Sequence, residues 1–119
     1  MSTPIPRISR EELLAKVNAR EPGFRLVEAL PTKYYAEAHL PRALNLPLDE
    51  VEDLAPTLLP DKAAPVVTYC ASAPCENSGL AAEHLVRLGY QNVREYYEGK
   101  EDWIGAGLPV ERGAAPVTR

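Results

Sequence analysis

The chain has 119 residues, of which 45% are hydrophobic and 25% are charged, and its formal net charge is −4. This length accommodates one domain, and the composition is typical of a soluble globular protein rather than of a disordered chain. The acidic balance does not favour nucleic acid or an anionic membrane as a partner, and the sequence shows neither a membrane span nor the apolar core of a secretion signal. Two cysteines cannot build a disulfide framework, so we expect a cytoplasmic location.

The first half of the chain predicts short helices that alternate with short strands. Ser9 and Glu12 form a capping box in front of an apolar stripe, which predicts a helix over residues 10–19. The elements expected next are a buried strand over residues 24–28, a short helix that opens at Pro31, a brief strand over residues 43–46, and a helix that Asp49 caps and Pro56 ends.

The second half repeats the alternation with clearer signals. Val66–Tyr69 is rich in β-branched residues and follows a proline, which predicts a strand. A loop over residues 70–77, a helix to Leu88 with Gly89 as its C′ residue, a strand over residues 92–97 and a helix over residues 101–106 follow. Because strands and helices alternate, we expect a small three-layer α/β domain, with a central parallel sheet of about four to five strands and helices on both faces. A single domain spans residues 1–119, with a core over about residues 9–111 and tails over residues 1–8 and 112–119.

Cys70 is the candidate functional residue because it stands at the carboxyl end of a predicted central strand. Ligands bind at that edge of open parallel sheets. The backbone N–H groups of the following loop and the start of the next helix would favour a thiolate, which is the nucleophilic form of cysteine. The small residues Ala71, Ser72 and Ala73 let the backbone curl around the sulfur. On position alone, a buried cysteine of the core is an equally good interpretation.

Several motifs in the same order resemble the rhodanese-like domain family. They are Leu26–Leu30, Tyr35–Pro47 around His39, Val66–Cys70, Leu88–Val93 and Tyr97–Val110, and together they cover about residues 24–111. The spacing of Cys70 and Cys75 resembles a branch of the family with a longer Cys-x-x-x-x-Cys active loop.

This resemblance implies a cytosolic, cofactor-free sulfurtransferase with a doubly wound parallel sheet and a persulfide on Cys70. It implies that a small sulfur donor or a persulfidated protein supplies the sulfur and that cyanide, a small thiol or a protein thiol accepts it. No metal, nucleic acid or membrane is expected to take part. The loop expected to bind the persulfide comprises Ala71, Ser72, Ala73, Pro74, Cys75, Glu76, Asn77 and Ser78.

Positive charge is absent from the predicted loop. No Lys or Arg lies between Lys62 and Arg87, and Glu76 stands where phosphatases of related fold need an arginine. These features argue against a phosphatase, and they favour a neutral or protein-borne persulfide over the dianion thiosulfate. Against the family pattern, Lys100 replaces the second glycine of a Gly-Gly pair, and Leu30 replaces a frequent arginine.

Two other functions fit the sequence. The domain could be a non-catalytic binding module on a rhodanese-like scaffold, because a fold does not fix a function. It could also be a redox switch in which Cys75 acts as a resolving thiol for Cys70.

The remaining notable side chains are expected to be structural. A zinc site built from Cys70, Cys75 and His84 would lack a fourth ligand. His39 is expected to hold a turn by hydrogen bonds, Trp103 is expected to lie in the core, and one side chain of the adjacent tyrosines at 96 and 97 must face outward.

Overall fold

The computed structural model describes residues 5–73 and 76–113, and strands alternate with helices throughout them. In chain order the elements are α1 (Arg10–Ala19), β1 (Arg25–Glu28), α2 (Thr32–Glu37), β2 (Leu44–Asn45), the 3-10 helix η1 (Leu48–Glu50), α3 (Val51–Leu58), β3 (Val66–Tyr69), α4 (Glu76–Arg87), β4 (Val93–Tyr96) and α5 (Gly99–Gly105). The predicted α/β class is confirmed, with bounds that differ from the expected ones by a few residues.

The four strands form one parallel sheet in the order β2-β1-β3-β4. In the register, Glu28 lies beside Tyr69 and Tyr69 lies beside Tyr96, so β1, β3 and β4 end level with one another. The chain moves outward from β1 to β2 and then returns across β1 to β3. The direction of winding therefore reverses between β1 and β3, and this reversal makes their carboxyl ends the switch point of the sheet.

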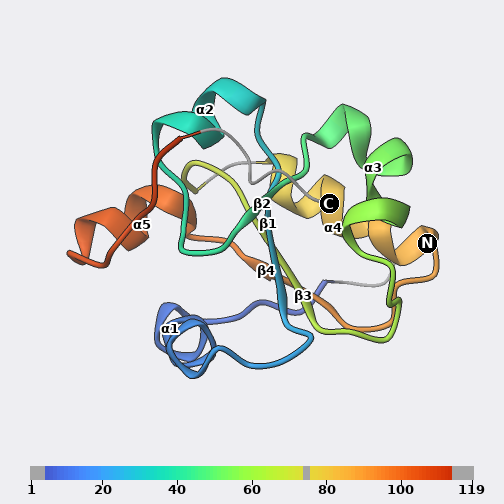
Figure 1. The fold of residues 1–119 in the computed structure, drawn as a ribbon, viewed down its shortest axis with the longest axis horizontal. Coiled ribbons are helices and arrows are strands. Elements are labelled where there is room, and N and C mark those ends of the chain that lie inside the picture. The colour runs from blue at the N-terminus through green and yellow to red at the C-terminus, as the bar shows by residue number, and fades with distance from the viewer. Residues whose placement is uncertain (1–4, 74–75, 114–119) are drawn as a thin grey trace.

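Helices cover both faces of the sheet. Figure 1 shows α3 and α4 on one side of the strands and α1 and α5 on the other. Successive strand residues point to opposite faces, so Val66 packs in the cluster under α3 and α4, whereas Val67 packs with α1 and α5. These two clusters are the two halves of the core, and they confirm the three-layer architecture.

Only one of the two hydrogen bonds of the predicted capping box forms at the start of α1. The Glu12 N–H donates to Ser9 Oγ at 3.1 Å, as expected. The Glu12 carboxylate does not return to Ser9 but binds the Arg94 guanidinium at 2.6 Å. That hydrogen bond holds the pKa of Glu12 below its ordinary value. A long-range ion pair has replaced a local contact that the sequence predicted.

Two expectations for α3 are wrong. Asp49 lies in η1, and the N-cap residue of α3 is Glu50, which makes no side-chain capping bond. Pro56 lies inside α3, which ends at Leu58. Because proline has no N–H, Pro56 cannot donate the helical hydrogen bond to the Glu52 carbonyl. Both residues are exposed, so water can bind that carbonyl instead.

The end of α4 matches the prediction. Gly89 adopts φ +103, its N–H donates to the Val86 carbonyl, and the Tyr90 N–H donates to the Leu85 carbonyl. These two bonds form a Schellman motif, which needs a residue with positive φ at C′.

The segment before α1 is part of the sheet edge. The Glu95 N–H donates to the Pro6 carbonyl at 2.9 Å, and the Ile8 N–H donates to the Glu95 carbonyl at 3.0 Å. Ile8 is buried in the core. The packed part of the chain therefore includes Ile8, next to the start of the core that the sequence predicted at about residue 9.

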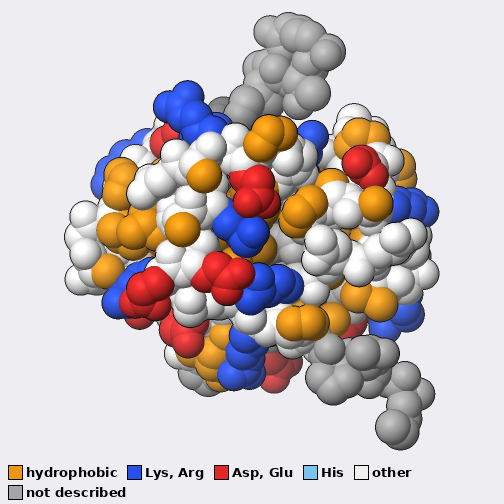
Figure 2. Space-filling view, turned by 90° about the horizontal axis from the view of Figure 1, so that it is seen from below, with side chains coloured by type: hydrophobic (Ala, Val, Ile, Leu, Met, Phe, Trp, Pro, Cys, Tyr) orange, Lys and Arg blue, Asp and Glu red, His pale blue; other side chains and the backbone are white. Residues whose placement is uncertain are grey.

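Charges of both signs are interspersed on the face that Figure 2 shows, rather than gathered into a patch of one sign. Among the described residues, no helix is long and apolar enough to cross a membrane.

Candidate active site

Cys70 directly follows β3, so it lies at the switch point of the sheet. The residue is buried, with 1% of its surface exposed. In the predicted loop, Ala71, Ser72 and Asn77 are half-buried and Ser78 is buried, whereas Ala73 and Glu76 are exposed. Pro74 and Cys75 lie outside the described residues, so the predicted role of Cys75 as a resolving thiol stays a prediction.

The backbone of the loop is oriented by the start of α5. The Lys100 N–H donates to the Cys70 carbonyl and the Glu101 N–H donates to the Ala71 carbonyl, both at 2.8 Å. A trans peptide places its C=O and N–H on opposite sides, so the N–H groups of Ala71 and Ser72 point away from α5. Neither N–H donates a hydrogen bond to another described residue. Within residues 5–73 and 76–113, these two donors are therefore unused.

Gly99 permits this close approach of α5. It adopts φ +80, and a Cβ atom there would lie 2.8 Å from the Cys70 carbonyl oxygen and 2.9 Å from the Ser72 nitrogen. Both the dihedral angle and the contact require glycine. The glycine that the family motif supplies therefore fixes the loop next to Cys70.

A chain of polar contacts runs from Cys70 into the layer between the sheet and α4. The Cys70 Sγ lies 3.6 Å from Ser78 Oγ, which donates to Glu95 Oε2 at 2.7 Å. Ser78 and Glu95 are both buried. The register explains the grouping, because Thr68 pairs with Glu95 and alternate residues of a strand share a face. Thr68 Oγ1 fixes the same turn of α4 by donating to the Ser78 carbonyl at 2.9 Å.

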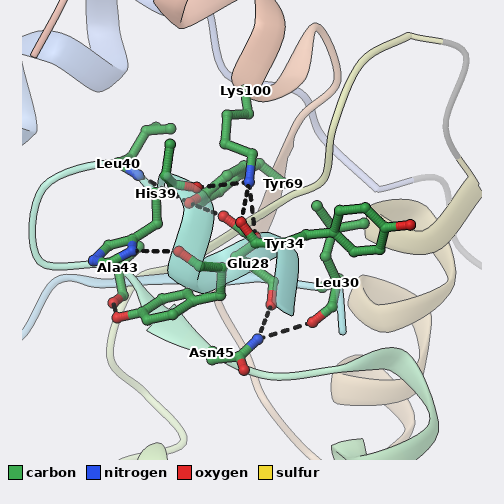
Figure 3. A network of polar contacts seen from close by, with 12 residues as sticks. Glu28, Leu30, Tyr34, His39, Leu40, Ala43, Asn45, Tyr69 and Lys100 are labelled. Carbon is green, nitrogen blue, oxygen red and sulfur yellow. Dashed lines mark hydrogen bonds and ion pairs between the residues drawn. The ribbon is translucent and has the colours of Figure 1, made fainter. Parts of the chain in front are cut away.

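A second polar network lies on the opposite face, as Figure 3 shows. The buried Glu28 accepts a hydrogen bond from the Tyr69 hydroxyl at 2.7 Å and pairs with Lys100 Nζ at 3.0 Å. Lys100 Nζ also donates to the carbonyls of Tyr34 and Ala38. Burial, and next the charge of Glu28, hold the pKa of Tyr69 well above its ordinary value. Lys100 thus supplies a cation to a buried carboxylate at a position where the family pattern has glycine.

The other notable side chains have structural contacts. His39 Nδ1 lies 2.8 Å from the Tyr35 carbonyl, and the His39 ring stacks on the Tyr35 ring. The Trp103 side chain is fully buried. Tyr96 is buried, whereas Tyr97 is half-buried. The predicted structural roles of His39 and Trp103 are confirmed by these contacts.

His84 is half-buried on α4. Within residues 5–73 and 76–113, no three His, Cys, Asp or Glu side chains group as metal ligands. A surface cavity of about 450 Å³ is lined by Arg25 and the turn before β1. It opens at the amino ends of the strands, the edge opposite Cys70, so it is not part of the cysteine site.

Sequence reasoning missed Glu95 and the role of Lys100, and it gave Ser78 no role of its own. The available signal for Glu95 was its acidic side chain in a strand that was expected to be buried. Lys100 was visible as a departure from the family pattern, but its partner Glu28 is 72 residues away along the chain.

The fold and the site together define a doubly wound α/β domain with a cysteine at its switch point. Residues 9–106 match the family described as the Rhodanese-like domain, and the chain belongs to this family. The branch with a longer active loop stays a prediction.

Similar proteins include a regulator and sulfurtransferases. The chain is 33% identical over 114 residues to the HTH-type transcriptional regulator Rv0324 of Mycobacterium tuberculosis, a match that covers 96% of this chain and 48% of the regulator. It is 39% identical over 59 residues to the thiosulfate sulfurtransferase PspE of Escherichia coli, covering 50% of this chain and 55% of PspE. The crystal structure of a thiosulfate sulfurtransferase from Pseudomonas aeruginosa aligns with a TM-score of 0.81 at 27% identity, over 92% of this chain and 20% of that one. The chain thus spans about half the length of these two curated relatives.

Proposed function

We propose that the domain is a sulfurtransferase that carries a sulfane sulfur as a persulfide on Cys70. The observation that supports this most is the orientation of the loop. The carbonyls of Cys70 and Ala71 are bound by α5, so the N–H groups of Ala71 and Ser72 point away from α5 and are unused by the described residues. Fixed N–H dipoles of this kind stabilise negative charge next to a nucleophile, as in an oxyanion hole. The family and the sulfurtransferases among its similar proteins support the same reaction class.

The reaction proceeds by two displacements at sulfur. The Cys70 thiolate attacks the outer sulfur of the donor, the donor's S–S bond breaks, and its electron pair leaves with the remainder, which is sulfite from thiosulfate or a thiolate from a persulfide. The new terminal sulfur carries the negative charge. An acceptor nucleophile then attacks that sulfur, the bond to Cys70 breaks, and the thiolate is restored. No net oxidant is needed, and cyanide as acceptor yields thiocyanate.

The charges near the site favour a neutral or protein-borne persulfide as the donor. Lys100 contacts the loop through its backbone N–H, but its ammonium group is bound to Glu28 and to two carbonyls. Within the described residues, no Lys or Arg side chain contacts residues 71–73 or 76–78 by a hydrogen bond or an ion pair. A dianionic donor therefore meets little compensating charge.

Intact-mass and fragment mass spectrometry test the proposal. The protein is reduced, freed from reductant, and treated with thiosulfate or with glutathione persulfide. We expect the mass of one added sulfur atom on Cys70, removal of that sulfur by cyanide, and no addition to Cys70 in the Cys70→Ser variant. Added sulfur on Cys75 alone would contradict the assignment.

A binding module is the second candidate function. The similarity to a transcriptional regulator over nearly the whole of this chain favours it, together with the burial of Cys70. This function predicts that no sulfur is added to Cys70 and that Cys70→Ala retains the biological effect. The redox switch stays a prediction, and mild peroxide followed by a thiol reductant tests it through a reversible disulfide.

A further inference from the structure

The surface cavity at the amino ends of the strands is lined by several positive charges. Three of its lining residues are Arg20, Arg25 and Arg42, and its volume of about 450 Å³ lies within the range of small-molecule sites. Among the described residues, none of these arginines forms an ion pair with a carboxylate. The cavity therefore gathers three guanidinium groups whose charge the described part of the chain does not neutralise.

The acidic side chains near these arginines are engaged elsewhere. Glu21 also lines the cavity, but its carboxylate pairs with Lys16 Nζ at 3.4 Å. The Glu111 carboxylate accepts a hydrogen bond from the backbone N–H of Arg42 at 3.1 Å, not from its guanidinium, and lies 3.6 Å from His39 Nε2. The guanidinium groups therefore keep N–H donors for an anion from outside the chain.

Backbone carbonyls hold two of the three guanidinium groups in place. The Val17 carbonyl, in the last turn of α1, accepts a hydrogen bond from the Arg20 N–H at 3.2 Å and another from the Arg42 guanidinium at 2.6 Å. Arg25 Nη1 donates to the Phe24 carbonyl at 3.2 Å. Because a guanidinium has five N–H donors, Arg25 and Arg42 retain most of theirs. Donors that are held before binding lower the entropic cost of capturing a ligand.

Two of the three arginines adopt a backbone conformation that disfavours them. Arg20, at the end of α1, has φ +50 and Arg42 has φ +62, and no other described residue except glycine has a positive φ. Glycine adopts this left-handed region without the steric cost that a side chain brings. Strain of this kind gathers at functional sites. Both strained residues are arginines that line one cavity, which indicates that their side chains are retained for binding.

Apolar side chains make up another part of the lining. Phe24, Leu44 and Leu58 line the cavity and are half-buried. Apolar surface beside fixed polar groups is typical of sites for small organic ligands. A guanidinium binds a carboxylate or a phosphate through two parallel hydrogen bonds, so three of them favour a doubly charged group. The lining therefore suits a ligand that joins such a group to an apolar body.

We propose that this cavity binds a small organic dianion. The three arginines hold its phosphate monoester or dicarboxylate group, and its apolar body lies against Phe24 and Leu58. Cys70 lies at the carboxyl ends of the strands, the opposite edge of the sheet, so the two sites are separate. The binding of the dianion therefore does not depend on sulfur transfer by Cys70.

The test is a titration of the full chain, followed by the NMR signals of its backbone amides. The probes are phenyl phosphate and benzylmalonate, which carry a phosphate monoester and a dicarboxylate on a similar apolar body. We expect saturable shifts at Arg25 and Arg42 with at least one probe, and the probe that binds identifies the anionic group. Benzyl alcohol, which lacks the charge, and inorganic phosphate, which lacks the apolar body, should bind about tenfold more weakly or worse.

Arg42→Gly and Arg20→Gly test the two strained arginines, and both should stay folded because glycine suits a positive φ. Each should weaken the binding of the dianion by about tenfold or more, as expected for the loss of a hydrogen bond to a charged group. Arg87→Gln is the matched control, because it removes the same charge from an exposed position of α4 outside the cavity. No saturable binding of either probe, shifts centred on the loop after Cys70, equally tight binding of benzyl alcohol, or equal affinities in the glycine variants and the control would overturn the proposal.

Discussion

Two buried glutamates lie on opposite faces of the same sheet, and their surroundings differ. Glu28 is fully buried, and its carboxylate is held by the Tyr69 hydroxyl and by the Lys100 ammonium. Glu95 is nearly as buried, but its side-chain partner among the described residues is the hydroxyl of Ser78, which in turn contacts Cys70. Both acids lie near the carboxyl ends of their strands, β1 and β4, which flank β3 in the sheet.

The difference separates a carboxylate that is paired with a cation from one that is bound by a neutral hydroxyl beside the cysteine. Through the Tyr69 hydroxyl and the Lys100 ammonium, Glu28 links β1 to β3 and to α5. The Glu95 carboxylate is bound instead by the neutral hydroxyl of Ser78, which lies next to Cys70. The cation Lys100 therefore indicates that the Glu28 network stabilises the fold.

Removal of the cation should have the largest effect on stability. Lys100→Met leaves Glu28 buried without its counter-charge, which typically costs about 3–5 kcal/mol of unfolding free energy. Glu95→Gln, which keeps the hydrogen bond from Ser78, should cost about 1 kcal/mol or less. Urea unfolding measures both, and the double variant Lys100→Met with Glu28→Gln should regain much of the loss. Equal losses of unfolding free energy in Lys100→Met and Glu95→Gln would contradict the difference between the two glutamates.

Substitution of Gly99 should disturb the loop next to Cys70. A Cβ atom would collide with the Cys70 carbonyl oxygen and the Ser72 nitrogen, and φ +80 is unfavourable for alanine. We expect Gly99→Ala to lose about 2 kcal/mol or more of stability and to slow sulfur uptake by Cys70. Gly107→Ala is the matched control, because Gly107 also has a positive φ but open space at its Cβ position. Equal sulfur uptake in the two variants would show that the close approach has no function.

Alkaline pH should weaken the side of the sheet that carries Glu28. Burial, and next the charge of Glu28, raise the pKa of Tyr35 from 10.0 to about 12. The folded state therefore binds this proton more tightly than the unfolded state does, so the stability gained is complete below pH 10 and is lost between pH 10 and about pH 12. Thermal unfolding across this range measures the loss. Tyr35→Phe should lose less stability over this pH range than the unmodified protein. An equal loss in that variant would assign the effect to other groups.

The contact that joins the start of α4 to β1 should have the smallest effect. Asn77 Nδ2 donates to the Ala29 carbonyl at 3.1 Å and is half-buried. Asn77→Ala should cost about 1 kcal/mol, as expected for one hydrogen bond, with little change in sulfur uptake by Cys70. A large change in that uptake would mean that Asn77 positions the loop as well as the helix.

Local signals predicted most elements, whereas long-range pairs were not visible. The bounds of α1 followed from Ser9 and the apolar stripe, and the end of α4 followed from Gly89, since each signal lies within one turn of the element that it ends. The prediction that Pro56 ends the helix was wrong, because the cost of a proline inside a helix depends on whether water can reach the carbonyl that loses its hydrogen bond. The position of Cys70 followed from its strand and from the family motifs. Glu95 and Lys100 could not be assigned, because their partners are set by strand register and by a contact across the fold.

The central claim is that Cys70 holds the transferred sulfur between two separate half-reactions. The most direct test loads the reduced protein with a sulfur donor, removes the donor, and then adds cyanide. We expect about one equivalent of thiocyanate per chain in this single turnover, and none from Cys70→Ser. Thiocyanate that forms only when donor and cyanide are present together would contradict a persulfide carried by Cys70.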